Sequence, residues 1–339
     1  MRIAEQAYGS DLSGLICGYV FSPDQGSRSM DSHAAAEWLQ AVREAADRPE
    51  FIWLHFSLSN VNSEKWLKEH LLLPEQFFET LHEGTGSTRI EQADDCLIAV
   101  INDVIYDFSY EASQIATLCM CVHRNYVISA RLHSLRSVDR LRVSVRAGET
   151  FVSPVSLLSH LLRDQAEVLQ QIAQNAVMRV DHIEDTLLAG RKDAKRSTLS
   201  ALRRVFVRMC RLLAPEPGAL FRLLNRPPAW FDEEDAQEFR AATEEFSAVL
   251  NDIAALQERT KLLQEEIAAH TTEQTNRSIF LLTMVTVFAL PINIVAGLLG
   301  MNVGGIPMAE DPRGFWIIVA IVASFTAVAG WYAFFKQRD

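Results

Sequence analysis

The first 277 residues contain no long apolar run, and no basic stretch followed by an apolar one opens the chain. We therefore expect no signal peptide and an N-terminal part that stays in the cytosol. Cysteine is scarce: Cys17, Cys96, Cys119, Cys121 and Cys210 are expected to be reduced thiols in that compartment. Positive charge is also in deficit, with 32 basic against 43 acidic residues and a net charge of −11. This balance argues against a nucleic-acid partner and favours the attraction of cations.

Motifs of enzyme chemistry are missing as well. We find no glycine-rich phosphate loop, no zinc-protease helix and no pairing of a nucleophile with a base. The sequence therefore predicts neither an enzyme nor ATP-driven pumping, and it predicts no cofactor.

Charge is absent from two long apolar stretches near the C-terminus, Ser278 to Ala309 and Gly314 to Phe335. A bilayer core of about 30 Å needs roughly 20 helical residues, so each stretch can span it. We predict transmembrane helices over 278–300 and 314–335, which makes the protein an integral part of a lipid bilayer.

Positive charge indicates the orientation of these spans. The connecting loop, 301–313, has almost none, whereas the tail, 336–339, carries Lys336 and Arg338. Basic residues favour the cytosolic side. The prediction is a multi-pass protein of the bacterial inner (plasma) membrane with both termini in the cytoplasm.

The fold class predicted for the whole chain is that of an α+β membrane protein. Residues 1–150 are expected to form a cytosolic α/β domain, with strands rich in Val, Ile, Leu and aromatic residues. The strands are predicted over 15–21, 51–57, 97–106, 115–122 and 126–130. Helices are predicted over 32–46, 62–70 and 74–82.

Residues 151–228 are expected to form packing helices. Ser153 and Pro154 are typical of a helix start, and an apolar stripe then runs to Gly190. A second helix, over 197–213, is strongly basic, and the four prolines of 215–228 predict a break. The basic helix could bind lipid headgroups, pair with acidic residues of the next helix, or screen cations electrostatically; the sequence leaves these three open.

Glycine and proline are both absent from 229 to 290. Acidic residues open this stretch at 232–235, as they do at helix N-termini. A single helix from Asp232 to Gly300 would be about 100 Å long at 1.5 Å per residue. We predict a stalk helix over 229–277 that continues without a break into the first span.

The polar residues of the first span, and Asn276 just before it, fall on one side of the predicted helix. Asn276, Thr283, Thr286 and Asn293 are spaced by 7, 3 and 7 residues. The same register adds Ile279, Leu290, Gly297 and Gly300. The stripe is either a set of hydrogen-bonding contacts between packed membrane helices or the wall of a wet central pore in a homo-oligomer.

Extending the register into the stalk favours the pore. One series of positions, repeated every seven residues, holds small residues. The other series on the same side is mostly acidic and consists of Glu244, Asn251, Glu258, Glu265 and Thr272. The other side of the stalk carries large apolar residues that can pack on another helix. A ring of such stalks would form a funnel that attracts cations toward the pore, although a solvated outer face would explain the acids equally well.

The first span ends in Gly300-Met301-Asn302, and Val-Gly-Gly-Ile-Pro follows. Gly-Met-Asn at this place, after this architecture, resembles the signature of the CorA family of divalent-cation transporters. The continuation resembles the ZntB branch, associated with zinc, as do Trp53-Leu54-His55 and Lys65-Trp66-Leu67. The resemblance covers most of the chain.

This resemblance implies a funnel-shaped homopentamer with the first span lining the pore. It places Asn302 at the outer mouth, where a ring of side-chain carbonyl oxygens would accept hydrogen bonds from the waters of a hydrated cation. Asn293, Thr286, Thr283 and Asn276 would form successive polar rings, with Leu290 and Ile279 as apolar constrictions.

Other metal ligands are possible outside the stripe. Cys119, Cys121 and His123 alternate on one face of a predicted strand, and His270 and Glu273 lie three residues apart on the stalk. Buried thiols and surface residues are the simpler explanations for these groups.

The prediction for function is Zn²⁺ transport through the central pore, passive or proton-coupled. A CorA-like magnesium, cobalt or nickel channel is the alternative, and a membrane-tethered cytosolic sensor that conducts nothing is a third.

Overall fold

The computed structural model describes residues 9–23, 25–44, 49–82, 88–111, 113–189, 196–301 and 311–336. Its chain divides into two compact units, Met1–Gln264 and Glu265–Asp339, and helix α9 continues from one into the other.

The first unit is built on a seven-stranded sheet in the order β2-β1-β3-β7-β6-β5-β4. Only the β3–β7 pair is parallel. The strands are β1 (Leu15–Ser22), β2 (Gly26–Met30), β3 (Phe51–Ser57), β4 (Arg89–Ala93), β5 (Cys96–Val104), β6 (Ile115–His123) and β7 (Tyr126–Arg131). Every residue of β5 is buried, because helices cover both faces of the sheet.

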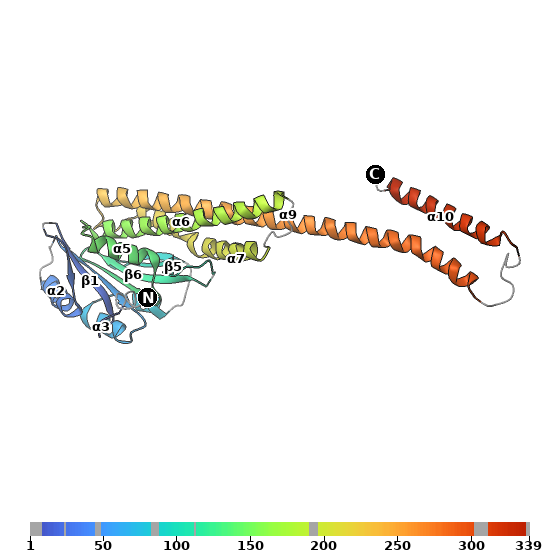
Figure 1. Cartoon of the computed structure of the whole chain (residues 1–339). Coiled ribbons are helices and arrows are strands. Elements are labelled where there is room, and N and C mark those ends of the chain that lie inside the picture. The colour runs from blue at the N-terminus through green and yellow to red at the C-terminus, as the bar shows by residue number, and fades with distance from the viewer. Residues whose placement is uncertain are drawn as a thin grey trace. The chain divides into compact units, whose positions relative to one another are not determined.

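Helices lie on the two faces of the sheet (Figure 1), and an apolar core lies on each face. One is formed with α5 (Arg136–Arg146), α6 (Pro154–Leu188), α8 (Pro215–Asn225) and the start of α9. The other is formed with α2 (Ser32–Glu44), α3 (Asn62–His70) and α4 (Glu75–His82). The soluble unit is therefore a three-layer structure, and the α/β character predicted for residues 1–150 is confirmed.

The strongly apolar strands and the helix start at Ser153 are confirmed. Ser153 caps α6, and its Oγ accepts a hydrogen bond from the Ser156 amide at 2.9 Å. The edge strands β2 and β4 and helix α5 were not predicted. Each is rich in polar residues and gives little apolar signal.

The predicted break over 215–228 is wrong, because Pro215–Asn225 forms helix α8. Pro215 and Pro217 stand in the first turn of the helix, where a missing amide proton costs nothing. Leu220 and Leu223 anchor the helix in the core. Only Pro227 and Pro228 lie beyond its end.

Helix α9 (Glu233–Leu299) has 67 residues, which confirms the predicted stalk and its continuation. Its large apolar side chains are buried as predicted, at Phe239, Phe246, Val249, Leu250, Ile253, Leu256, Leu263 and Ile267. Helix α7 (Arg196–Leu213) matches the predicted basic helix, and α10 (Gly314–Lys336) matches the second apolar stretch.

Glu216 of α8 is a fully buried carboxyl group whose oxygen Oε2 accepts a hydrogen bond from Thr88 Oγ1 at 3.0 Å. Burial raises the pKa of Glu216 well above its usual value, and the charge of Asp103 raises it further. Burial also raises the pKa of Asp103 to about 6. Because the folded state holds these protons more tightly, stability falls as pH rises from about 4.5 through the folded-state pKa values.

We expect Glu216→Gln to weaken this pH dependence. The amide keeps an acceptor for Thr88 and carries no charge, so the variant should gain stability over the wild type increasingly toward pH 8. Thermal unfolding of the detergent-solubilised protein between pH 5 and 8 measures this; ~1 kcal/mol shifts Tm by roughly 2–4 °C at this domain size. Equal shifts at all pH values would contradict the assignment.

Candidate cation pathway

The predicted polar stripe lies on one side of α9 and is exposed. Seven of its members are accessible in the described chain: Asn276, Ile279, Thr283, Thr286, Leu290, Asn293 and Gly297. At 3.6 residues per turn, their spacings keep them within about a third of the helix circumference.

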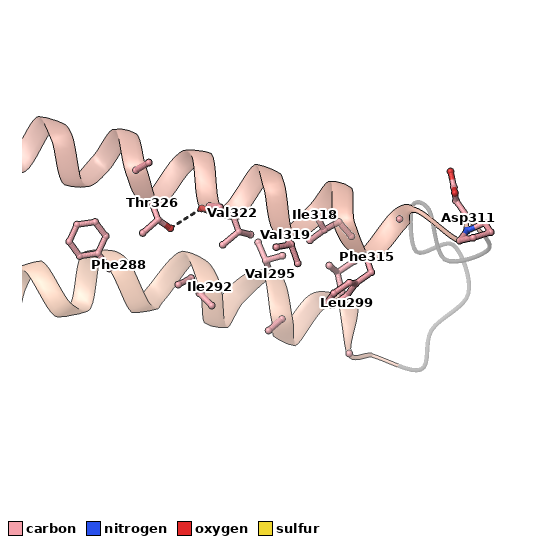
Figure 2. A pocket seen from close by; sticks show the side chains of 16 residues that line it. Phe288, Ile292, Val295, Leu299, Asp311, Phe315, Ile318, Val319, Val322 and Thr326 are labelled. Atoms are coloured by element: carbon pink, nitrogen blue, oxygen red, sulfur yellow. Dashed lines mark hydrogen bonds between the residues drawn. The ribbon is translucent and has the colours of Figure 1, made fainter.

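Helix α10 faces a different side of α9. Figure 2 shows Phe288, Ile292, Val295 and Leu299 turned toward α10, opposite Ile318, Val319 and Val322. The two helices line an apolar groove with a volume of about 1260 Å³. Helical geometry places this side of α9 roughly half a turn from the polar stripe. The second span therefore leaves the stripe uncovered, apart from Gly300, which also lines the groove.

The α10 side of this contact was not predicted. The helix is apolar all round, and a uniform pattern gives no clue to which residues meet a neighbour. Among the described α10 residues that line the groove, Thr326 is the one with a polar side chain, and it donates a hydrogen bond to its own helix at Val322 O, 2.8 Å away.

The polar groups of the stripe are only partly satisfied within the chain. Thr286 Oγ1 donates to Leu282 O at 2.9 Å. Among the residues that the structure describes, Asn293 has no hydrogen-bond partner. An unsatisfied amide in hydrocarbon costs several kcal/mol by order of magnitude. Asn293 therefore needs water or another copy of the chain.

The predicted funnel residues are also exposed along α9: Glu244, Asn251, Glu258, Glu265 and Thr272. Glu258 accepts a hydrogen bond from Lys261 Nζ at 2.9 Å, an ion pair within the helix. No described cation is paired with Glu244 or Glu265. This side of α9 thus combines small residues with mostly unneutralised carboxylates.

Of the predicted pore mouth, the structure describes only Gly300 and Met301. Gly300 closes the helix through its amide, which donates to Ala296 O at 2.9 Å. A Cβ on Gly300 would approach Ala296 O to 3.0 Å, so a larger residue would strain this closure. Met301 is half exposed. Asn302 and the rest of the loop to Glu310 lie outside the described residues.

The other predicted ligands are not gathered into a metal site. No group of three or more His, Cys, Asp or Glu that could hold a metal is found among the described residues. His270 and Glu273 are exposed on α9. On β6, Cys119 donates to Thr80 O at 3.6 Å, and His123 stacks on Tyr126 with ring centroids 4.7 Å apart.

Cys121 is kept protonated. A hydrogen bond with Cys96 raises the pKa of the Cys121 thiol, and burial raises it further. A protonated buried thiol is a poor metal ligand, so packing explains Cys121. Burial lowers the pKa of His123.

Membrane insertion is consistent with the helices described. Helix α9 is long and apolar enough over its C-terminal part to cross a bilayer, and that part is not buried within the chain. Gly314–Val328 of α10 is a shorter apolar helix. The C-terminal part of α9 therefore meets the length requirement of a membrane span.

Comparisons with known proteins agree with this architecture. The family described as CorA-like Mg²⁺ transporter protein matches residues 49–337. The divalent cation transporter CmaX of Pseudomonas aeruginosa is 30% identical over 98% of this chain and 99% of its own length. The zinc transport protein ZntB of Pectobacterium carotovorum is 21% identical over 83% of this chain and 85% of its own.

Solved structures show the same fold. That of full-length CmaX superposes with a TM-score of 0.79 at 27% identity, covering 98% of this chain and 100% of that one. The CorA magnesium transporter of Methanocaldococcus jannaschii gives 0.72 at 17% identity, covering 93% and 96%. With its soluble α/β unit, its long helix and the family match over most of its length, the chain belongs to the CorA family of divalent-cation transporters, whose members are not enzymes.

Proposed function

We propose that this transporter carries Zn²⁺ across the bacterial inner membrane, through a central pore formed by α9 in a homopentamer. The observation that supports it is the position of the polar stripe on α9, half a turn from the side that faces α10. A stripe left uncovered by its own chain can meet the same stripe in other copies. Water and an ion then satisfy the polar groups between them.

Ion passage through such a pore follows from the order of residues along α9. Asn276, Thr283, Thr286 and Asn293 offer neutral oxygens that can hydrogen-bond the waters of a hydrated ion without trapping it. Leu290 and Ile279 narrow the path with apolar rings and can gate it by excluding water.

Electrostatics supports the entry of cations. Glu244 and Glu265 are acidic residues on the exposed side of the same helix. Each further copy of the chain in the oligomer therefore adds negative charge around the pore axis. Such a potential raises the local concentration of cations at the pore. Both termini are proposed to lie in the cytoplasm, which puts these carboxylates on the cytosolic side.

The identity of the ion is the finer part of the proposal. Support for zinc comes from the ZntB relatives, named as zinc transport proteins, at 20–23% identity. The stripe contains no His, Cys or carboxylate, so it offers none of the ligands that prefer zinc to magnesium. That donor set favours the second candidate, a hydrated magnesium, cobalt or nickel ion.

Coupling to protons would have to use groups outside the apolar part of α9, because that part has no titratable side chain. Glu265, His270 and Glu273 lie on α9 before this part. We propose them as the groups to examine if proton movement accompanies zinc.

Zinc and proton flux measured together in proteoliposomes test the proposal. We expect saturable zinc uptake that a tenfold excess of magnesium does not suppress. Suppression by magnesium would favour the second candidate. The absence of flux for zinc, magnesium, cobalt and nickel alike would leave only a tethered sensor.

A further inference from the structure

One side of helix α7 carries an arginine-lined hollow that the transport function does not use. Its volume is about 470 Å³, within the range of small-molecule sites. It is lined by Ser200, Arg203, Arg204, Val207, Arg208, Arg211 and Gln264. The α7 residues recur every three or four positions and so share one side of the helix, while its leucines and Phe206 are buried on the other.

The four arginines of the hollow are not neutralised within the described residues. None of them forms an ion pair there. Arginines elsewhere in this unit do find carboxylates: Arg163 Nη1 lies 2.9 Å from Glu238, and Arg259 Nη2 lies 2.8 Å from Asp181. The described chain therefore does not pair these arginines with carboxylates of the stalk. Such pairing was one of the three explanations left open for this helix.

Arg208 provides a second, independent sign of a missing ligand. Its Nε is buried and has no hydrogen-bond partner in the described structure. A buried donor on a charged group is costly when it lacks an acceptor. The lining residues thus include a guanidinium with one unmet hydrogen-bond donor.

The wall of the hollow is already positioned by α9. Arg203 Nη1 donates to Gln264 Oε1 at 2.8 Å, and Gln264 Nε2 donates to Ser200 Oγ at 3.1 Å. Because Ser200 Oγ accepts this bond, its own proton remains available to an acceptor in the hollow. Gln264 also holds Arg203 without neutralising it.

We propose that this hollow binds an anion with two or more phosphate or phosphodiester oxygens exposed, such as a nucleoside polyphosphate or a phospholipid headgroup. Guanidinium forks match phosphate oxygens bidentately, and several arginines on one helix side suit a multiply charged group. The hollow is larger than a single phosphate needs, which leaves space for the rest of the molecule.

Binding to the full-length protein in detergent tests this proposal. Calorimetric titration with magnesium-free ATP, with pyrophosphate and with the soluble lipid dihexanoyl phosphatidylglycerol separates the two sources of phosphate. The double variant Arg204→Gln/Arg208→Gln should weaken binding of the effective ligand at least tenfold. The control Arg222→Gln/Arg226→Gln removes the same charge from α8 and its C-cap, and it should change the binding less than twofold.

The outcomes are distinct. Preference for ATP and pyrophosphate identifies a free polyphosphate, and preference for the lipid identifies a headgroup. No binding of any of the three, or equal loss in both double variants, overturns the proposal. A change of oligomeric state in the Arg204/Arg208 variant would also overturn it, since the arginines would then contact another copy. If that variant does not fold, Arg208→Lys, which keeps the charge but loses the fork, must still weaken binding.

Discussion

Replacing Asn302 by alanine is expected to lower the maximal zinc flux at least tenfold. In the proposed pore, Asn302 side-chain oxygens ring the outer mouth and accept hydrogen bonds from the waters of the entering ion. Without them the ion must give up those contacts before it reaches Asn293, and ~1.4 kcal/mol added to a barrier already slows a step about tenfold.

The measurement is zinc uptake into proteoliposomes at matched protein content. Met308→Ala provides the control, because it alters the same loop outside the Gly-Met-Asn motif and should keep flux within about twofold of the wild type. Normal flux in Asn302→Ala would count heavily against an asparagine ring at the mouth.

Cysteine placed on the two sides of α9 is expected to give opposite results. Asn293 belongs to the polar stripe, and Val295, two residues further, faces α10 in Figure 2. In Asn293→Cys, a positively charged methanethiosulfonate reagent should react from water and block flux by more than tenfold. A fixed charge and added bulk would then stand in the ion's path.

Val295→Cys is the matched control for this experiment, since it lies at nearly the same depth but on the apolar groove. It should transport, and the reagent should change its flux by less than twofold. The five native cysteines lie far from both positions in sequence, and four of them are buried, so the treated wild type corrects for any background. Block through Val295→Cys and not through Asn293→Cys would reverse the assignment of the pore side.

The ion-pathway prediction needs only local periodicity, which is why it can be made from the sequence. Thr283 and Asn293 recur with the helix period in a segment that excludes charge, and Asn276 continues their register just before it. An α-helix must place these residues together. The unbroken α9 follows from the absence of glycine and proline between 229 and 290. The buried strands follow from their apolar composition, since a strand covered on both faces has no polar side.

Edge strands and proline-containing helices depend on contacts instead. β2 and β4 are polar and form because a neighbouring strand supplies their hydrogen bonds. Helix α8 forms despite its prolines because Leu220 and Leu223 gain a place in the core. Local propensity is weak against such burial.

By itself, the sequence determined the family resemblance, the two apolar spans and the polar register of α9, because each is a property of consecutive residues. Tertiary structure alone decided which side of α9 faces α10 and which arginines stay without carboxylates. Arg203 meets Gln264 across 61 positions of sequence, and Phe288 faces α10 across the loop between the spans. Such contacts depend on how separate helices pack, and no periodicity within one helix encodes its neighbour's position.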